Sequence, residues 1–108
     1  MTLFNIHEVS KWFEVLQTTK QTQTAVMILT VGKHSSEETN SHEKSDQVLL
    51  LLEGELHAEV GAVKRIMRQG DTCIVSAGTP HRFENRGSGR AVTFNVYSPP
   101  AYPPGEKG

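Results

Sequence analysis

The sequence predicts an all-β domain, a sandwich or a barrel, with one short helix near its N-terminus. Seven or eight short apolar or β-branched runs follow one another, separated by turn signals rich in glycine, asparagine and aspartate. Apolar residues recur at helical spacing only near the start of the chain. A length of 108 residues fits one domain with a single modest core.

The expected elements can be placed in order along the chain. Asn5 and Glu8 resemble a capping box, so we expect a short helix over about residues 6–12, with residues 13–18 already extended. The β-branched segment 22–31 predicts a long buried strand. Further strands are expected at 48–52, 56–60, 63–67, within 70–77, from His81 onward, and at 91–97.

Composition excludes several classes of function. The net charge of −1 and the absence of a basic run argue against nucleic acid and against an anionic membrane surface. The longest apolar run, Val48 to Leu52, is too short to span a bilayer. Residues 1–4 lack the features of a signal peptide, and the lone Cys73 suits a reducing compartment. We therefore expect a cytoplasmic protein with no nucleic-acid or membrane partner.

Chemistry-bearing residues gather in two segments. In GDTCIVSAGTPHRFEN, the turn at Gly78 to Pro80 presents His81 at the start of a strand. Such a histidine could be a metal ligand, an acid or base, or a hydrogen-bonded structural residue. Upstream, Glu38, Asn40 and His42 stand two residues apart, so an extended chain would present them on one face.

These two segments resemble the paired motifs of the cupin superfamily. The second cupin motif resembles Gly70-x5-Ser76-x-Gly78-x2-His81-x3-Asn85, and the first resembles Asn40-x-His42-x4-Gln47-x6-Gly54. The resemblance covers about residues 25–97. A closer similarity is to small bacterial cupins labelled mannose-6-phosphate isomerase-like, and it rests on His42-x3-Asp46-Gln47 and on Tyr97-Ser98-Pro99-Pro100. The label does not establish isomerase chemistry.

The resemblance implies a single cupin domain over residues 1–108, a jelly-roll barrel with its core at about 14–97. The Pro-rich segment 98–108 is expected to be a tail outside the folded core. By position in the motifs, the ligands of a divalent metal (Zn, Ni, Mn or Fe) would be His42, Gln47 and His81. Asn40 stands where cupins have their first histidine.

This ligand set is neutral, which weakens the case for catalysis. Two histidines and two amides leave the charge of a divalent ion uncompensated, unless Glu38 restores one negative charge. Strand parity further predicts a pocket lining, made of Glu38, Leu49, Leu51 and Phe83.

Three functions follow as hypotheses. The first is a metal-dependent cupin that binds, and in one version transforms, a small polar metabolite such as a sugar or organic acid. Glu38 and His81 are then the candidate catalytic groups, and dioxygenase chemistry is disfavoured without a carboxylate ligand. The second is a metal-free binding or sensing domain that uses the amides as hydrogen-bonding groups. The third is a homodimer formed through the N-terminal helix and the segment 22–31.

Overall fold

A computed structural model describes residues 1–36 and 42–108 of the chain. Within these residues, a 3-10 turn η1 (Ile6–Glu8) precedes eight strands. The strands are β1 (Phe13–Thr18), β2 (Gln23–Leu29), β3 (Asp46–Glu53), β4 (Glu55–Val60), β5 (Val63–Arg68), β6 (Thr72–Val75), β7 (His81–Glu84) and β8 (Ala91–Ser98). The sequence-based strands are therefore recovered, with small shifts at their ends.

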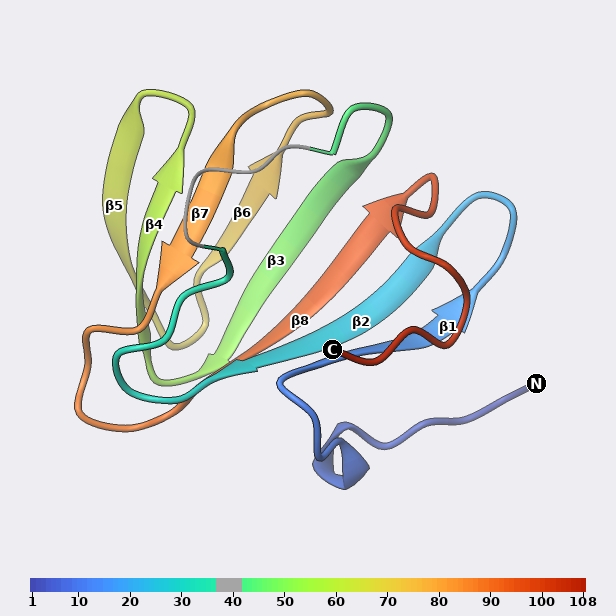
Figure 1. Ribbon diagram of the computed structural model, residues 1–108, viewed down its shortest axis with the longest axis horizontal. Helices are drawn as coiled ribbons and strands as arrows, with labels where there is room; N and C mark the ends of the chain where they lie inside the picture. The colour runs from blue at the N-terminus through green and yellow to red at the C-terminus, as the bar shows by residue number, and fades with distance from the viewer. Residues whose placement is uncertain (37–41) are drawn as a thin grey trace.

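The strands form two antiparallel sheets that lie against each other as a sandwich (Figure 1). The larger sheet has the order β1-β2-β8-β3-β6, and the smaller has the order β5-β4-β7. β8 lies at the centre of the larger sheet, where it pairs with β2 on one side and β3 on the other. The first and last parts of the chain therefore meet within one sheet.

The expectation of a closed barrel is wrong. Closure would require strand pairing to continue around the whole structure. The consecutive strands β6 and β7 instead belong to different sheets, and the turn between them contains Gly78 at a φ of +79°. The result is a sandwich with two separate sheets.

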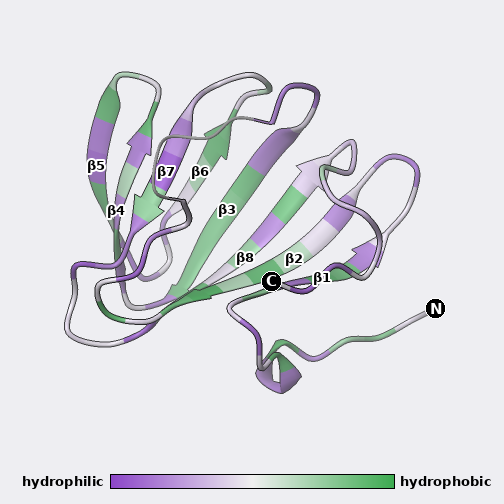
Figure 2. Cartoon of the chain, viewed as in Figure 1, coloured by the Kyte–Doolittle hydropathy of each residue, from purple (hydrophilic) through white to green (hydrophobic). Residues whose placement is uncertain are grey.

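The main core fills the space between the sheets. Along β3, buried and more exposed residues alternate, so that Gln47, Leu49 and Leu51 face inward. Leu56 from β4 and Phe83 from β7 meet them from the smaller sheet. β3 begins with hydrophilic residues and continues as an apolar run (Figure 2). The polar start of β3 thus lies at one end of a mainly apolar core.

The predicted N-terminal helix is limited to one 3-10 turn. The Asn5 side chain does cap it, accepting a hydrogen bond from the backbone N–H of His7 at 2.9 Å. The helix ends at once because Val9 is extended and the carbonyl of Trp12 accepts a bond from the N–H of Ile28 on β2. Pairing with the sheet therefore replaces helical bonding. Among the described residues, no helix has the length and apolar character needed to cross a membrane.

The C-terminal segment is not a detached tail, which corrects the expectation for residues 98–108. Ala101 and Tyr102 pack against the main core. The backbone of Glu106 accepts a bond from the N–H of Val15 at 2.8 Å, and the N–H of Gly108 donates to the carbonyl of Phe13 at 2.7 Å. The segment therefore runs alongside β1 and covers one end of the sandwich (Figure 1).

Candidate functional site

A cavity of about 250 Å³ lies between the sheets, beside the C-terminal segment. Residues from both cupin-like segments line this cavity, together with residues from β1, β8 and the C-terminal segment. The residues that line it include His42, Gln47, His81, Phe83, Tyr97 and Tyr102. The fold therefore brings together three of the four residues expected to bind a metal.

His81 is placed by the turn before it. The carbonyl of Pro80 accepts a bond from the N–H of Gly61 at 2.8 Å, which ties the start of β7 to the β4–β5 turn. The buried His81 ring places its Nδ1 3.0 Å from the carbonyl oxygen of Thr79. Because a carbonyl only accepts, Nδ1 carries the proton in this contact. The lone pair of the neutral ring is then at Nε2, as in many histidine metal ligands.

His42 lies directly beside His81, with their ring centroids 5.1 Å apart. The backbone also joins the two segments, since the N–H of Gly78 donates to the carbonyl of His42 at 2.7 Å. Burial, and then the proximity of His81, lower the pKa of His42 from 6.5. His42 is therefore held as a neutral imidazole at neutral pH, the form that can coordinate a metal.

Two tyrosines enclose His42. Its ring lies edge-on to Tyr97 at 5.2 Å and to Tyr102 at 5.5 Å between centroids. Burial raises the pKa of both phenols, so their hydroxyl groups stay protonated. The aromatic rings of both tyrosines therefore pack against His42 at the cavity.

Gln47 contributes the third polar group. Its side chain is only 3% exposed, and its Nε2 donates to the Oδ1 of Asn95 at 2.9 Å. Among the described residues, its Oε1 has no hydrogen-bond partner although the atom is buried. A buried acceptor without a partner is costly, so this oxygen is suited to a ligand, a water molecule or a cation.

The residues that line the cavity include donor types suited to a divalent cation. Two imidazoles and one amide oxygen are acceptable donors to a transition metal, but they bring no negative charge. No group of three or more His, Cys, Asp or Glu side chains suited to a metal occurs within residues 1–36 and 42–108. Glu38 and Asn40 lie outside the described residues.

The expected apolar lining is found only in part. Phe83 lines the cavity next to His81, at 6.0 Å between ring centroids. Leu49 and Leu51 do not line it, because they lie farther along β3, fully buried in the core between the sheets. Inward orientation alone does not bring a residue to the cavity, which occupies only one end of the sandwich.

Sequence reasoning missed Tyr97, Asn95 and Tyr102. A signal was present for the first two, because they stand two apart on a predicted strand and so share one face. The tyrosine in the tail gave a weaker signal, an aromatic residue among prolines. Its place depends on the buried Gln23, whose side chain bonds the backbone of Ala101 and of Tyr102.

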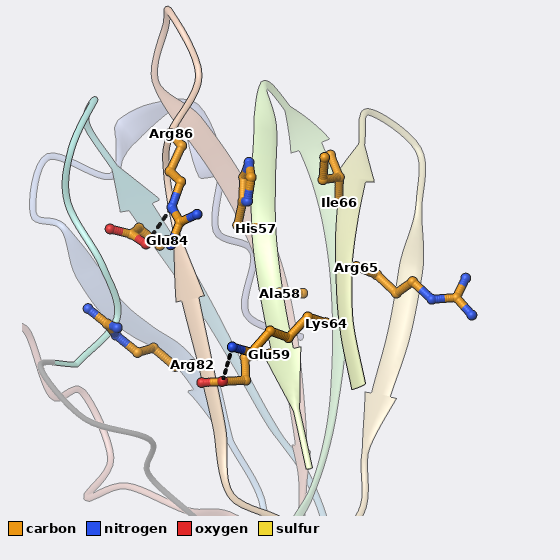
Figure 3. A pocket seen from close by; sticks show the side chains of 9 residues that line it. All are labelled: His57, Ala58, Glu59, Lys64, Arg65, Ile66, Arg82, Glu84 and Arg86. Carbon is orange, nitrogen blue, oxygen red and sulfur yellow. Dashed lines mark hydrogen bonds and ion pairs between the residues drawn. The ribbon is translucent and has the colours of Figure 1, made fainter. Parts of the chain in front are cut away.

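A second hollow lies on the outer face of the smaller sheet and contains His57 (Figure 3). Figure 3 shows Arg86 turned toward Glu84 and Lys64 toward Glu59, at 2.8 Å and 3.5 Å. The Lys64–Glu59 pair joins β4 and β5, and the Arg86–Glu84 pair lies within one segment; such partly exposed ion pairs are ordinary features of a solvated sheet. This hollow therefore offers no equivalent of the buried donors between the sheets.

Fold and site together define a class of small antiparallel β-sandwich proteins with a histidine-containing cavity between the sheets. Residues 25–97 match the family model described as the cupin domain. The chain therefore belongs to the cupin family. No curated protein shows a significant match to the chain.

Several solved structures share this fold. BH2720 from Bacillus halodurans has 22% identity and a TM-score of 0.89, over 98% of this chain and 86% of that one. TT1209 from Thermus thermophilus has 22% identity and a TM-score of 0.81, over 92% and 98%. KdgF from a Halomonas species has 18% identity and a TM-score of 0.81, over 93% and 94%. Identities this low show a common fold and nothing finer.

Proposed function

We propose that this cupin holds a divalent transition metal between His42, Gln47 and His81 and binds a small polar metabolite there. The observation that carries the proposal is the buried Oε1 of Gln47, which lacks a partner among the described residues in a cavity that also holds two imidazoles. A cation would satisfy this oxygen and both ring nitrogens at once. Zn, Ni, Mn and Fe are the metals in question.

Each residue has a separate task in this proposal. His81 is oriented through its bond to Thr79, and His42 is kept neutral by burial. Tyr97 and Tyr102 exclude water from the side of His42. A metal bound here would act as a Lewis acid that polarises an oxygen of the metabolite.

Transformation of the metabolite is the finer form of the proposal. A sugar or an organic acid fits a small cavity of mixed polarity. His81 is a poor base if its Nε2 binds the metal and its Nδ1 donates to Thr79. Glu38 is then the remaining candidate for proton transfer.

Metal content tests this proposal directly. Protein purified without chelator should contain metal by elemental analysis, and His42→Ala and His81→Ala should each lose it. His57→Ala is the matched control, because it removes a histidine from the outer face of the smaller sheet. Metal loss in the control as well, or its absence from the unsubstituted protein, would contradict the proposed site.

A metal-free binding domain is the second candidate. It is favoured by the neutral character of the donors, since amide groups suit an uncharged hydroxylated ligand. In that case the Oε1 of Gln47 would accept a hydrogen bond from the ligand. Binding of a sugar by chelator-treated protein, with an affinity unchanged by added Zn²⁺, would support this candidate over the first.

We also propose that the protein forms a homodimer in a reducing, cytoplasmic environment. The surface expected from the sequence, the N-terminal helix with segment 22–31, is less suited to this, because Val26 of β2 is buried in a cluster against which Ile6 and Val9 pack. Val48 and Ile74 pair across β3 and β6 on the outer face of the larger sheet, where they are 38% and 65% exposed. Burying this face against a second copy would remove apolar surface from water. Ile74→Glu should shift sedimentation toward monomer, and a native protein that is already monomeric at micromolar concentration would refute the dimer.

A further inference from the structure

We infer that Thr93 and Asn95 are positioning residues that fix the polarity of the cavity by turning the carbonyl oxygen of Gln47 toward it. This inference rests on the proposed function, because it concerns the same cavity and the ligand group that the cavity accepts. It is carried by a continuous chain of hydrogen bonds through the larger sheet, from the backbone of β2 to the side chain of Gln47.

This series of hydrogen bonds starts at a group that can only accept. The carbonyl oxygen of Met27 can only accept, and the Oγ1 of Thr93 lies 3.0 Å from it as the donor. A hydroxyl group has one proton, so Thr93 can only accept from its other neighbour. That neighbour is the Nδ2 of Asn95, at 2.9 Å from Oγ1.

The direction of the Asn95 amide then determines that of Gln47. With its Nδ2 directed to Thr93, Asn95 presents Oδ1 to β3, and this oxygen accepts from the Nε2 of Gln47 at 2.9 Å. The Oε1 of Gln47 is left on the side away from Asn95, unpartnered among the described residues. The assignment of both amides thus follows from the bonding network.

Burial makes the donor-to-acceptor direction of these hydrogen bonds hard to reverse. Thr93 and Asn95 have no exposed surface, and Gln47 is 3% exposed, so water has little access to replace a lost bond. Turning Gln47 alone would bring its Oε1 against the Oδ1 of Asn95, two acceptors in contact. Turning Asn95 as well would remove its Nδ2 from Thr93. The carbonyl of Met27 therefore sets the orientation of an amide two strands away.

This orientation selects the chemistry of the ligand. An amide oxygen facing the cavity attracts a cation or the proton of a hydroxyl or N–H group. It repels a carboxylate or phosphate oxygen at the same point. The reversed amide would do the opposite, although the residue and its volume would be unchanged. Specificity at Gln47 therefore depends on Thr93, which does not line the cavity.

Thr93→Val tests this inference, because valine keeps the shape of threonine but removes the hydroxyl group that holds Asn95. Both amides can then reverse, so Gln47 presents its NH2 group to the cavity. We expect the affinity for Zn²⁺ alone, measured by calorimetry, to fall at least about tenfold. Hydrogen exchange of the Gln47 side-chain NH2, followed by NMR, should accelerate. Thr93→Ser, which keeps the hydroxyl, should preserve both values.

Two readouts separate this inference from the proposed function. If the native protein binds no Zn²⁺ but Thr93→Val still exposes the Gln47 NH2 group, the metal proposal fails and the positioning role stands. If Thr93→Val leaves both Zn²⁺ affinity and NH2 exchange unchanged, the positioning role is overturned. Should Thr93→Val not fold, Asn95→Ala removes the other link and is judged by the same two measurements.

Discussion

Replacing Gln47 by glutamate would place an ionisable carboxyl group at a position that is 3% exposed. A carboxylate cannot donate to the Oδ1 of Asn95, so Asn95 must reverse and donate its Nδ2 instead. The hydroxyl of Thr93 can then turn from Met27 to Asn95, and one hydrogen bond is lost, at about 1 kcal/mol. Desolvation of the carboxylate adds a further penalty of about 1–3 kcal/mol or more.

Without metal, Gln47→Glu should therefore lower the free energy of unfolding at pH 8 by about 2–4 kcal/mol. For a domain of this size, the corresponding fall in Tm is at least about 8 °C. A divalent cation would reverse the effect, because a carboxylate compensates its charge where an amide does not. We expect Zn²⁺ to bind at least about tenfold more tightly than to the native protein.

Thermal unfolding in EDTA and in excess Zn²⁺ measures the change in stability. Calorimetric titration measures the affinity for Zn²⁺. Gln47→Met is the matched control, since it keeps the volume but has neither the oxygen nor a charge. It should bind Zn²⁺ more weakly than the native protein. A glutamate variant that is as stable as the native protein in EDTA and gains no affinity for Zn²⁺ would refute this reasoning.

Three further predictions concern other residues of the fold. The lowered pKa of His42 means that the neutral side chain contributes fully to stability above about pH 6.5, and that this contribution is lost as the pH falls below that value. The midpoint of the His42 titration, followed by NMR, should lie below 6.5. A midpoint above 6.5 would contradict this prediction. Gln23→Leu removes the side-chain hydrogen bonds to the C-terminal segment, so the free energy of unfolding should fall by about 2–4 kcal/mol. The backbone amide of Tyr102 should also exchange faster with solvent. Unchanged exchange would show that other contacts hold the segment. Gly54→Ala should lower the free energy of unfolding by at least about 2 kcal/mol, as measured by denaturant titration. Gly54 has a φ of +88°, and a Cβ at this position would collide with the backbone of Arg90 and lie 2.9 Å from the Cα of Ala91. Gly70→Ala, at a φ of +94° with open space around it, should cost less, and equal losses would remove the collision as the cause.

Strand positions were predictable because their signals are local. β-Branched runs and turn residues lie within a few positions of each other, and each run became a strand. The position of His81 at the start of β7 also follows from the turn before it. The spacing of the two cupin motifs identified His42, Gln47 and His81 as members of one site, and all three line the same cavity.

Strand β8 shows where local signals mislead. A simple hydropathy reading of its alternating residues would direct Phe94 and Val96 to the core and Thr93 and Asn95 to solvent. The structure instead buries the polar pair completely between the sheets, and Phe94 and Val96 lie partly buried on the other face, where Phe94 packs against a second apolar cluster. The inward polar residues are tolerated because Met27, Gln47 and one another supply their hydrogen bonds. Met27 and Gln47 are on other strands, so no window of sequence around β8 contains them.

The all-β class, the order of the strands along the chain and the histidines of the site could all be read without the fold. Each of these depends on residues that are close in sequence or on the spacing of a motif. Tertiary contacts were needed to establish that the sheets remain separate, that Tyr102 lines the cavity and that the Oε1 of Gln47 is buried without a partner among the described residues. These features depend on hydrogen bonds and packing between strands far apart in sequence, where the direction of one buried donor fixes the next.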